Sequence, residues 1–360
     1  MATHRPSGLP LPASSGPPDP RGQVRQDRVP VRTGRGVPRR IGFLLIPDFA
    51  VIAYACAMEA YRAANDLAGK QLYAWRHISP HGRPVPASNG IAILPDQGID
   101  RPCDVDDLLV CAGGNPTAFE DPATFAWLRA QAAHGIRIGG VSGGPEILAR
   151  AGLLHGYRCT AHWEYIPAMR ERFPDLLLTQ SLYEIDRERC TCAGGTAALD
   201  MAVTLIEAEY GQPLAHAVAE WFLHTRPRAK NEPQRMSLRE RYEVKHHGLL
   251  QVLAAMEAAL EVPLPRTALA RSAGVSVRQL ERLFRTHLGR SIGAHYLSLR
   301  LEHARRLLRQ TSLSVLETAL ACGFASAAHF SRSYRARFGV APRMERTGAA
   351  RRAAQEEAGR

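Results

Sequence analysis

The pattern of hydrophobic and polar positions divides this chain into two folded regions, two tails and a linker. From residue 41 to 225, short apolar runs alternate with segments of helical periodicity, whereas residues 248–345 follow helical periodicity. Residues 1–40 hold eight of the twenty-five prolines and almost no large apolar side chains, so they cannot bury enough surface to fold. We therefore expect disordered tails at 1–40 and 346–360 and a linker over 226–247.

The N-terminal region predicts a doubly wound α/β sheet. Strands alternate with helices along it, and ligands of such sheets bind beyond the carboxyl ends of the strands. Glycine turns follow two strands, at Gly113-Gly114 and at Ser142-Gly143, so we expect the ligand site there. The predicted strands are 41–46, 73–79, 108–112 and 136–141, with a hairpin near 90–94, and the predicted helices are 50–67, 121–134, one from Pro145, and 196–209.

Residues 314–342 predict two helices joined by a tight turn. Ser314 and Glu317 form a capping box that begins the first helix, and Gly323 supplies the left-handed residue of the turn. Ser326 is expected to cap the second helix. The first helix has apolar positions at Leu316, Ala319 and Leu320, and the second places Phe330, Tyr334 and Phe338 on one face and His329, Arg332, Arg335 and Arg337 off that face.

The same pattern occurs about fifty residues earlier, where Gly274 and Gly289 match Gly323 and Gly339. Residues 292–310 lie between the two copies and predict one long helix that fixes the distance between them. Two helices that enter successive major grooves on one face of DNA lie about 34 Å apart. One chain with two helix-turn-helix units can thus read what usually needs a dimer. The other matches are Leu280 with Phe330, Arg282 with Arg332, Phe284 with Tyr334, Arg285 with Arg335 and Leu288 with Phe338.

The formal net charge of +12 is unevenly distributed along the chain. Residues 245–345 carry fifteen basic and six acidic side chains, whereas residues 41–244 carry nineteen basic and twenty-four acidic ones. The two tails are basic as well. A basic C-terminal region complements the phosphates of DNA, and we expect the acidic middle region not to touch DNA.

The seven cysteines show neither a paired framework nor the spacing of metal ligands, which fits a reducing compartment. Cys190 and Cys192 would share one face of a strand, where we expect them to be core residues. Arg39-Arg40 before an apolar run resembles a twin-arginine export signal, but Pro47 interrupts the run, so a buried first strand is favoured. We expect a cytoplasmic protein with no membrane span, no metal and no cofactor.

Residues 248–345 resemble the DNA-binding domain of the AraC/XylS family of transcription regulators. The resemblance rests on SVRQLERLFRTHLG (276–289), LRLEHARRLL (299–308) and ACGFASAAHFSRSYRARFGVAPR (321–343). It implies double-stranded DNA as a partner and leaves RNA polymerase open as another. Arginine pairs well with guanine and glutamine with adenine in the major groove. The candidate DNA-binding residues are Arg278, Gln279, Arg282 and Arg285 in the first recognition helix, and Ser326, His329, Arg332 and Arg335 in the second.

Residues 140–144 fit the pattern G-x-S-x-G, in which a strained strand-to-helix turn exposes a nucleophilic hydroxyl. Backbone N–H groups near Gly143 and Gly114 are candidates for an anion-binding nest. A serine nucleophile needs an adjacent base that a third group holds in place. His162 is the nearby candidate along the sequence, and no carboxylate partner for it is evident. We therefore favour a pseudo-elbow that binds a small molecule over a hydrolase that uses Ser142.

Residues 41–225 resemble the glutamine-amidotransferase-like fold shared with PfpI-type peptidases. In catalytic relatives the elbow residue is a cysteine, whereas Ser142 stands here, so we assign no catalytic residue. A serine hydrolase or amidase tethered to DNA is the alternative function. The motifs that carry the resemblance are LLVCAGGNP (108–116), GGVSGGPEILARAGLL (139–154), CTAHW (159–163) and CAGGTAALDMAV (192–203).

The combination of the two regions resembles the GlxA-like branch of the AraC family. Residues 221–345 look most like regulators of carnitine, glycine betaine or arginine catabolism, through motifs such as HTRPRAKNEPQRMSLRERY (224–242). This implies an activator that senses a small cationic or zwitterionic metabolite, and a homodimer formed through helix 196–209 and the segment ending at Trp221. Aromatic faces and negative charge favour a quaternary ammonium. The candidate ligand-binding residues are Gly113, Gly114, Ser142, Gly143, His162, Trp163, Tyr183 and Glu184.

Overall fold

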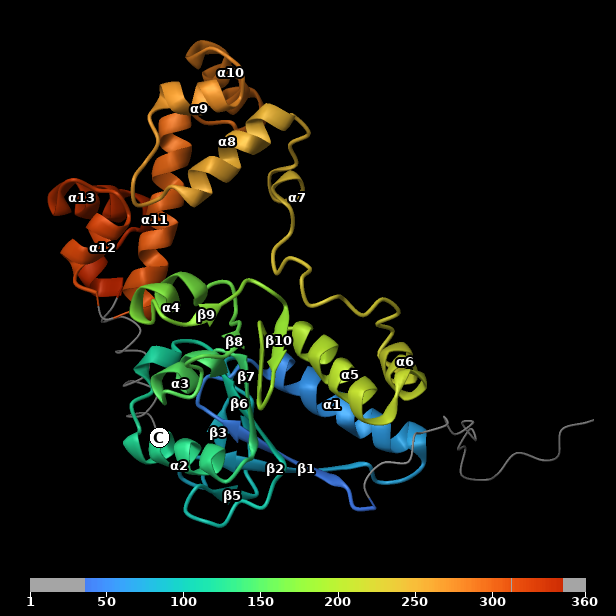
Figure 1. Ribbon diagram of the computed structural model, residues 1–360. Helices are drawn as coiled ribbons and strands as arrows, with labels where there is room; N and C mark the ends of the chain where they lie inside the picture. The colour runs from blue at the N-terminus through green and yellow to red at the C-terminus, as the bar shows by residue number, and fades with distance from the viewer. Residues whose placement is uncertain (1–35, 312, 346–360) are drawn as a thin grey trace, which may run out of the picture.

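The chain forms an α/β region followed by an all-helical region, as Figure 1 shows. The computed structural model describes residues 36–311 and 313–345. The predictions of disorder for residues 1–35 and 346–360 lie outside the described residues.

A seven-stranded sheet forms the centre of the α/β region. Its strands are β1 (Arg39–Leu45), β2 (Tyr73–Ser79), β5 (Gln97–Gly98), β6 (Asp107–Ala112), β7 (Arg137–Ser142), β10 (Tyr183–Asp186) and β11 (Arg189–Cys192). They lie in the order β10-β11-β7-β6-β1-β2-β5, and only the pairing of β10 with β11 is antiparallel within this sheet. The doubly wound α/β sheet predicted from the alternation of strands and helices is confirmed.

Two short ribbons lie beside the sheet. The first, β3 (Val85–Pro86) with β4 (Ala92–Ile93), is antiparallel and contains the hairpin predicted near residues 90–94. The second pairs β8 (Arg158–Cys159) with β9 (Leu177–Leu178) in parallel.

The first strand begins two residues earlier than predicted. The backbone N–H of Arg39 donates to the carbonyl oxygen of Leu72 at 2.9 Å, and its side chain pairs with the buried carboxylate of Asp107. Arg137 reaches the same carboxylate at 2.6 Å. The prediction of a disordered tail was therefore wrong for Arg39 and Arg40, because two arginines before an apolar run give no local signal for a strand.

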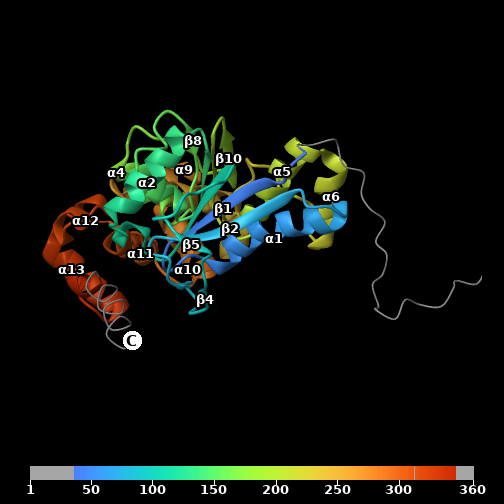
Figure 2. The ribbon, with the colours of Figure 1, turned by 90° about the horizontal axis from the view of Figure 1, so that it is seen from below.

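Helices cover both faces of the sheet (Figures 1 and 2). One face carries α1 (Val51–Ala68), α5 (Ala197–Tyr210) and α6 (Gln212–Trp221), and the other carries α2 (Pro122–Ala133), α3 (Gly144–Arg150) and α4 (Ile166–Arg172). Successive residues of a strand point to opposite faces. Accordingly, Phe43 and Leu45 pack in the core of the first face, and Leu44 and Ile46 pack in the core of the second.

Helix α5 is enclosed by its own chain. Its apolar side chains, among them Leu205 and Ile206, are buried in the core shared with α1 and α6. These side chains have no free area to offer a partner, and the dimer surface predicted on this helix stays a prediction for its exposed side around Glu207 and Ala208. At the end of α6, Trp221 is 40% exposed and Leu223 is 88% exposed.

The all-helical region consists of two units that share one helix. Its helices are α7 (Leu238–Tyr242), α8 (His247–Ala258), α9 (Arg266–Ser272), α10 (Val277–Leu288), α11 (Ile292–Gln310), α12 (Val315–Ala321) and α13 (Ala327–Phe338). The start of α11 packs in the core of the first unit, through Ile292 and Tyr296, and its end packs in the core of the second, through Leu301 and Leu307. Helix α11 thus joins the two units rigidly. No helix within the described ranges has the length and apolar composition that a membrane crossing needs.

The predicted linker, residues 226–247, is bound to the α/β region. Arg228 pairs with the buried carboxylate of Asp200 at 2.7 Å, and Lys230 pairs with that of Glu184 at 3.1 Å. These ion pairs hold the segment along the α/β region, so it is more than a flexible tether. We refer to residues 226–247 as the bound segment.

Helices α4 and α11 bring the two regions into direct contact. Ala168 of α4 is 5% exposed and belongs to the core of the second helical unit. Arg172 of α4 donates to the carbonyl oxygen of Gln310 at 3.3 Å and also pairs with the buried carboxylate of Glu146 in α3. Helix α3, which follows Ser142, is therefore linked through Arg172 to the end of α11.

Candidate DNA interface and ligand site

Helices α10 and α13 begin and end as the sequence repeat requires. The Ser276 hydroxyl accepts the backbone N–H of Gln279 at 3.2 Å, and the Ser326 hydroxyl accepts that of His329 at 3.2 Å. Each helix ends at a glycine in the left-handed region, Gly289 with φ 65° and Gly339 with φ 75°. The caps predicted at Ser314 and Ser326 and the left-handed turn residue predicted at Gly323 are all present.

The apolar stripes of α10 and α13 face inward and the basic side chains face solvent. Leu280 and Phe284 of α10 and Phe330 and Tyr334 of α13 are fully buried. The two helices are thereby anchored with their polar faces outward, which is the arrangement that entry into a groove needs. All eight predicted DNA-binding residues are exposed: Arg278, Gln279, Arg282, Arg285, Ser326, His329, Arg332 and Arg335.

Two of these eight residues, Gln279 and Ser326, already serve as helix caps. The side-chain oxygen of Gln279 accepts the backbone N–H of Ser276 at 2.8 Å, which completes a capping box. Pairing with adenine uses both the oxygen and the nitrogen of the amide. Gln279 would have to leave this cap to read a base in that way, whereas Arg278 and Arg282 are not engaged in caps.

Arg300, which the sequence reasoning did not single out, stabilises the second unit. Arg300 of α11 donates to the carbonyl oxygens of Cys322 and Gly323, each at 2.6 Å, and its guanidinium carbon lies 4.0 Å from the centroid of the Phe324 ring. These contacts fix the turn between α12 and α13 on the connecting helix. The turn therefore depends on a residue outside the repeat.

The Ser142 turn has the backbone of a nucleophile elbow. Ser142 adopts φ 61°, a left-handed value that is rare for a residue other than glycine. It is the last residue of β7, just before α3, and a Cβ atom at Gly194 would come within 2.5 Å of the Ser142 Cβ. Strain of this kind persists where the surrounding structure enforces it, and here Gly194 allows the close approach. Ser142 itself is only 6% exposed.

The predicted base does not engage this serine. The backbone N–H of His162 donates to the carbonyl oxygen of Ser142 at 3.3 Å, but within the described residues no hydrogen bond joins their side chains. Instead, the Nδ1 atom of His162 accepts the backbone N–H of Glu164 at 3.4 Å and lies 3.8 Å from its carboxylate. Burial lowers the pKa of His162. The sequence reasoning missed Glu164 as the carboxylate beside this histidine.

The glycines at the strand ends are packed against the chain itself. A Cβ atom at Gly113 would come within 2.5 Å of the carbonyl oxygen of Asp48, and one at Gly114 within 3.0 Å of the Asp48 side chain. The N–H of Gly143 donates to the carbonyl oxygen of Ala112 at 2.9 Å. The prediction of an anion-binding nest is therefore wrong for Gly143, because its donor is already used.

Tyr183 and Glu184 lie on opposite faces of β10. The hydroxyl of Tyr183 accepts a hydrogen bond from Thr204 of α5 at 3.0 Å, so this side chain belongs to the first core. Glu184 is 1% exposed and accepts hydrogen bonds from Ser181 at 2.8 Å and from Lys230 at 3.1 Å. Although burial opposes it, these hydrogen bonds hold the pKa of Glu184 below its ordinary value. The prediction that Tyr183 and Glu184 line one pocket together is therefore wrong.

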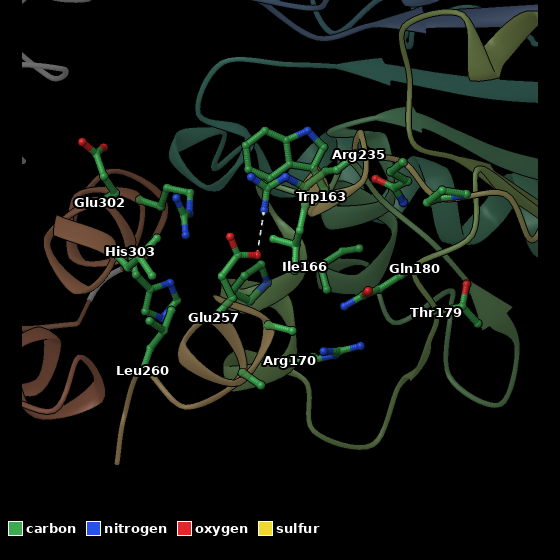
Figure 3. A pocket seen from close by; sticks show the side chains of 18 of the residues that line it. Trp163, Ile166, Arg170, Thr179, Gln180, Arg235, Glu257, Leu260, Glu302 and His303 are labelled. Carbon is green, nitrogen blue, oxygen red and sulfur yellow. Dashed lines mark ion pairs between the residues drawn. The ribbon is translucent and has the colours of Figure 1, made fainter. Parts of the chain in front are cut away.

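A cavity of about 1290 Å³ lies between the α/β region and the helical region. It is lined by Trp163 beside α4, by Arg235 of the bound segment, by Glu257 of α8 and by His303 of α11, among others (Figure 3). Glu184 also lines it. This cavity exceeds the usual size of small-molecule sites, about 300–1,000 Å³.

The structure divides the predicted ligand residues among three places. Trp163 and Glu184 line the cavity between the regions, whereas Tyr183 is buried under α5. The strand-end group consists of Gly113, Gly114, Ser142, Gly143 and His162. Arg235 and Glu257 were missed, and the charged composition of the linker was the signal that could have directed attention to the first of them.

Two families match the chain. The helix-turn-helix domain family matches residues 269–348, and the DJ-1/PfpI family matches residues 40–208. The HTH-type transcriptional regulator GbdR of Pseudomonas aeruginosa is 45% identical over 311 residues, which cover 86% of this chain and 85% of that protein. The HTH-type transcriptional regulator GlxA of Rhizobium meliloti is 45% identical over 309 residues, which cover 84% of this chain and 94% of that protein.

The α/β region also has an enzyme among its relatives. Isonitrile hydratase of Pseudomonas putida is 29% identical over 188 residues, which cover 50% of this chain and 75% of that protein. The likeness is thus confined to part of the chain, whereas the regulators match across both regions.

Proposed function

Because this chain belongs to the GlxA-like branch of the AraC-type transcription regulators, with a DJ-1/PfpI region before the helix-turn-helix region, we propose that it is a sequence-specific transcription activator controlled by a small metabolite. Its helical region contacts double-stranded DNA through α10 and α13. The α/β region senses the metabolite, and the bound segment and α4 transmit the signal.

The repeated basic face is the observation that carries this proposal. Arg282 and Arg285 of α10 correspond to Arg332 and Arg335 of α13, and all four are exposed on helices whose opposite faces are buried. A single solvated basic helix has many explanations. Two equivalent ones joined by one connecting helix are the arrangement expected of a protein that reads two successive major grooves.

Selection of bound duplexes from a random-sequence pool tests this proposal with the full-length protein. We expect an enriched motif with two half-sites whose centres lie about 10 base pairs apart. Enrichment of a single half-site would assign base readout to one unit only. Recovery of duplexes without a shared motif would contradict sequence-specific binding.

The proposed effector class is a betaine, a carnitine or an amino acid. This class follows from the resemblance of residues 221–345 to regulators of carnitine, glycine betaine or arginine catabolism. A thermal-shift screen of these compounds tests it, because a ligand that binds only the folded protein raises its apparent stability. We expect one zwitterion of the panel to raise the melting temperature in a concentration-dependent way.

We infer that the chain is not an enzyme. Full-length relatives are named as regulators, and Ser142 lacks the hydrogen bond to a histidine side chain that its activation needs, within the described residues. The alternative, a DNA-tethered serine hydrolase or amidase, predicts turnover of an ester or amide that Ser142→Ala abolishes. A sensor has no such turnover to lose, and Ser142→Ala would at most change its affinity for the ligand.

We further propose a homodimer that acts in the cytoplasm, where its DNA target lies, with RNA polymerase as a further partner. The exposed apolar side chains of Trp221 and Leu223 at the end of α6 support this end of the molecule as the dimer surface.

A further inference from the structure

Trp163 already holds a cation that the chain itself supplies. The guanidinium carbon of Arg235 lies 4.5 Å from the centroid of the Trp163 ring, and both side chains line the cavity between the two regions (Figure 3). A guanidinium over an indole is attracted by the same ring quadrupole that attracts a quaternary ammonium. The aromatic face predicted for a ligand is therefore occupied by an internal side chain.

The same arginine connects the α/β region to the first helical unit. One guanidinium nitrogen of Arg235 lies 3.8 Å from the carboxylate of Glu257 in α8. Glu257 in turn pairs with Arg241 at 2.8 Å and accepts a hydrogen bond from Tyr242 at 3.2 Å. Arg235 thus contacts Trp163 on one side and, on the other, the carboxylate that joins α7 to α8.

A second arginine lines the cavity without a close ion-pair partner within the described residues. Arg306 of α11 lines the cavity and makes no hydrogen bond or ion pair there, and Glu302 of the same helix pairs with Arg337 at 3.2 Å instead. The Nδ1 atom of the neighbouring His303 is also buried without a partner in the described ranges. The Arg306 side chain is partly buried, and a carboxylate is the group that best pairs with a guanidinium.

We propose that this cavity binds a zwitterion whose quaternary ammonium replaces Arg235 on Trp163 and whose carboxylate pairs with Arg306. The inference rests on the proposed function, since it places the effector of that function between the two regions. Binding separates Arg235 from Glu257, so the effector changes how α8 and the first helical unit are held. Such a change requires that the effector favour one arrangement over the other, and displacement of Arg235 supplies that preference.

The test compares glycine betaine and tetramethylammonium chloride as probes of the full-length protein, with binding measured by calorimetry. Removal of the internal competitor by Arg235→Ala should tighten binding of glycine betaine by about 3- to 30-fold, the range that one cation–π contact represents. Arg235→Gln, which keeps most of the side-chain volume, should give the same gain, and Arg235→Lys should bind as the wild type does. Trp163→Ala should weaken both probes.

The carboxylate half of the proposal has its own readout. Arg306→Ala should weaken binding of glycine betaine but leave tetramethylammonium unchanged, because that probe has no carboxylate. Arg226→Ala is the matched control, since Arg226 lies in the same segment as Arg235. Its side chain is 86% exposed, and among the described carboxylates it lies close to that of Glu232 alone, at 3.8 Å. This control should bind both probes as the wild type does.

If the wild type binds glycine betaine and the folded Arg235→Ala and Arg235→Gln proteins bind it equally or more weakly, Arg235 does not compete with the ligand for Trp163. That result overturns the proposed displacement and leaves the proposed function intact. Failure of both probes to bind even the Arg235→Ala protein overturns the site. A wild type that selects no DNA motif is the separate result that would overturn the proposed function itself.

Discussion

Arg282 and Arg332 show what a single side chain contributes at the DNA interface. Both are exposed in the second turn after the cap of their helix, and they occupy equivalent positions in the repeat. The first turns of a recognition helix contact base edges, whereas phosphate contacts lie toward the flanks. Arg285 is less free, because it lies 3.6 Å from the carboxylate of Glu281 on the same helix.

We predict that Arg282→Ala relaxes base preference at one or two positions of the selected motif, by about 1–3 kcal/mol of discrimination per lost contact. Arg332→Ala should do the same in the other half-site. Binding to single-base variants of the motif measures this. Arg62→Ala is the charge-matched control, because Arg62 pairs with Glu59 and Asp66 on α1 of the α/β region. Uniform weakening across all variants would instead make Arg282 a phosphate contact.

Residues differ in how far their role can be predicted from sequence. The caps at Ser314 and Ser326 depend on neighbours within four positions, so their pattern is complete in the sequence. The partners of Glu184 depend on which face of β10 it occupies and on Lys230, far along the chain. Likewise, the stacking of Arg235 on Trp163 leaves no local pattern, because the two residues meet only when the segment folds back.

At the scale of elements, the two helix-turn-helix units are equivalent in sequence but not in packing. Gly274 and Gly323 both adopt left-handed φ values, 66° and 71°. A Cβ atom at Gly274 would meet nothing within 4 Å, whereas one at Gly323 would come within 2.7 Å of the carbonyl oxygen of Glu261. The loop between α8 and α9 therefore packs on the turn of the second unit, which the repeat alone did not predict.

We predict that Gly323→Ala destabilises the protein more than Gly274→Ala. Both variants place a Cβ atom in a left-handed residue, at about 1–2 kcal/mol. Only the change at Gly323 adds a clash with backbone atoms, at about 1–3 kcal/mol more. Urea denaturation of the full-length variants, followed by circular dichroism, measures the difference. Equal losses of stability would mean that the loop between α8 and α9 moves away freely.

Glu345 ties the C-terminal end of the described chain to α11. Arg305 and Arg309 donate to its carboxylate at 3.1 and 2.7 Å, and the carboxylate side chain is 5% exposed. Although burial opposes it, these hydrogen bonds hold the pKa of Glu345 below its ordinary value. A depressed carboxyl pKa means that the unfolded state binds this proton more readily than the folded state.

We predict that Glu345→Gln destabilises the protein by about 1–2 kcal/mol at neutral pH, since solvent reaches both arginines and weakens the pairs. The contribution of Glu345 is present above its ordinary pKa and is lost as the pH falls through its folded pKa. The wild type and the variant should therefore approach each other in unfolding free energy in acid. A constant difference between neutral pH and pH 3 would contradict this role.

At the scale of the whole molecule, the two regions are joined twice. One junction is the bound segment with Arg235, and the other is the packing of α4 on α11 around Ala168. Figure 2 shows α12 and α13 at the end of the molecule opposite α6, so the proposed dimer surface and the second helical unit are far apart. The two-region architecture was predictable from periodicity. The junctions were not, because α4 had no distinct periodic signal and its buried alanine resembles any helix residue.

We predict that Ala168→Asp uncouples the effector from transcription without abolishing DNA binding. Ala168 is buried between α4 and the second helical unit, so a carboxylate there meets apolar side chains such as Leu301 and Leu307 and separates the surfaces. The core of each region stays intact because α4 contributes only this one side chain to the helical core. The variant should bind the selected DNA motif as tightly as the wild type in a gel-shift assay.

In the same variant, a reporter gene under the selected motif should no longer respond to the effector. Ala208→Asp is the matched control, because Ala208 lies on the exposed side of α5 and the same charge there disturbs no contact between the regions. Its reporter response should equal that of the wild type. A full effector response in the Ala168→Asp protein would show that the α4 junction carries no signal. Transmission would then be assigned to the bound segment and Arg235, which connect Trp163 to α8 among the described residues.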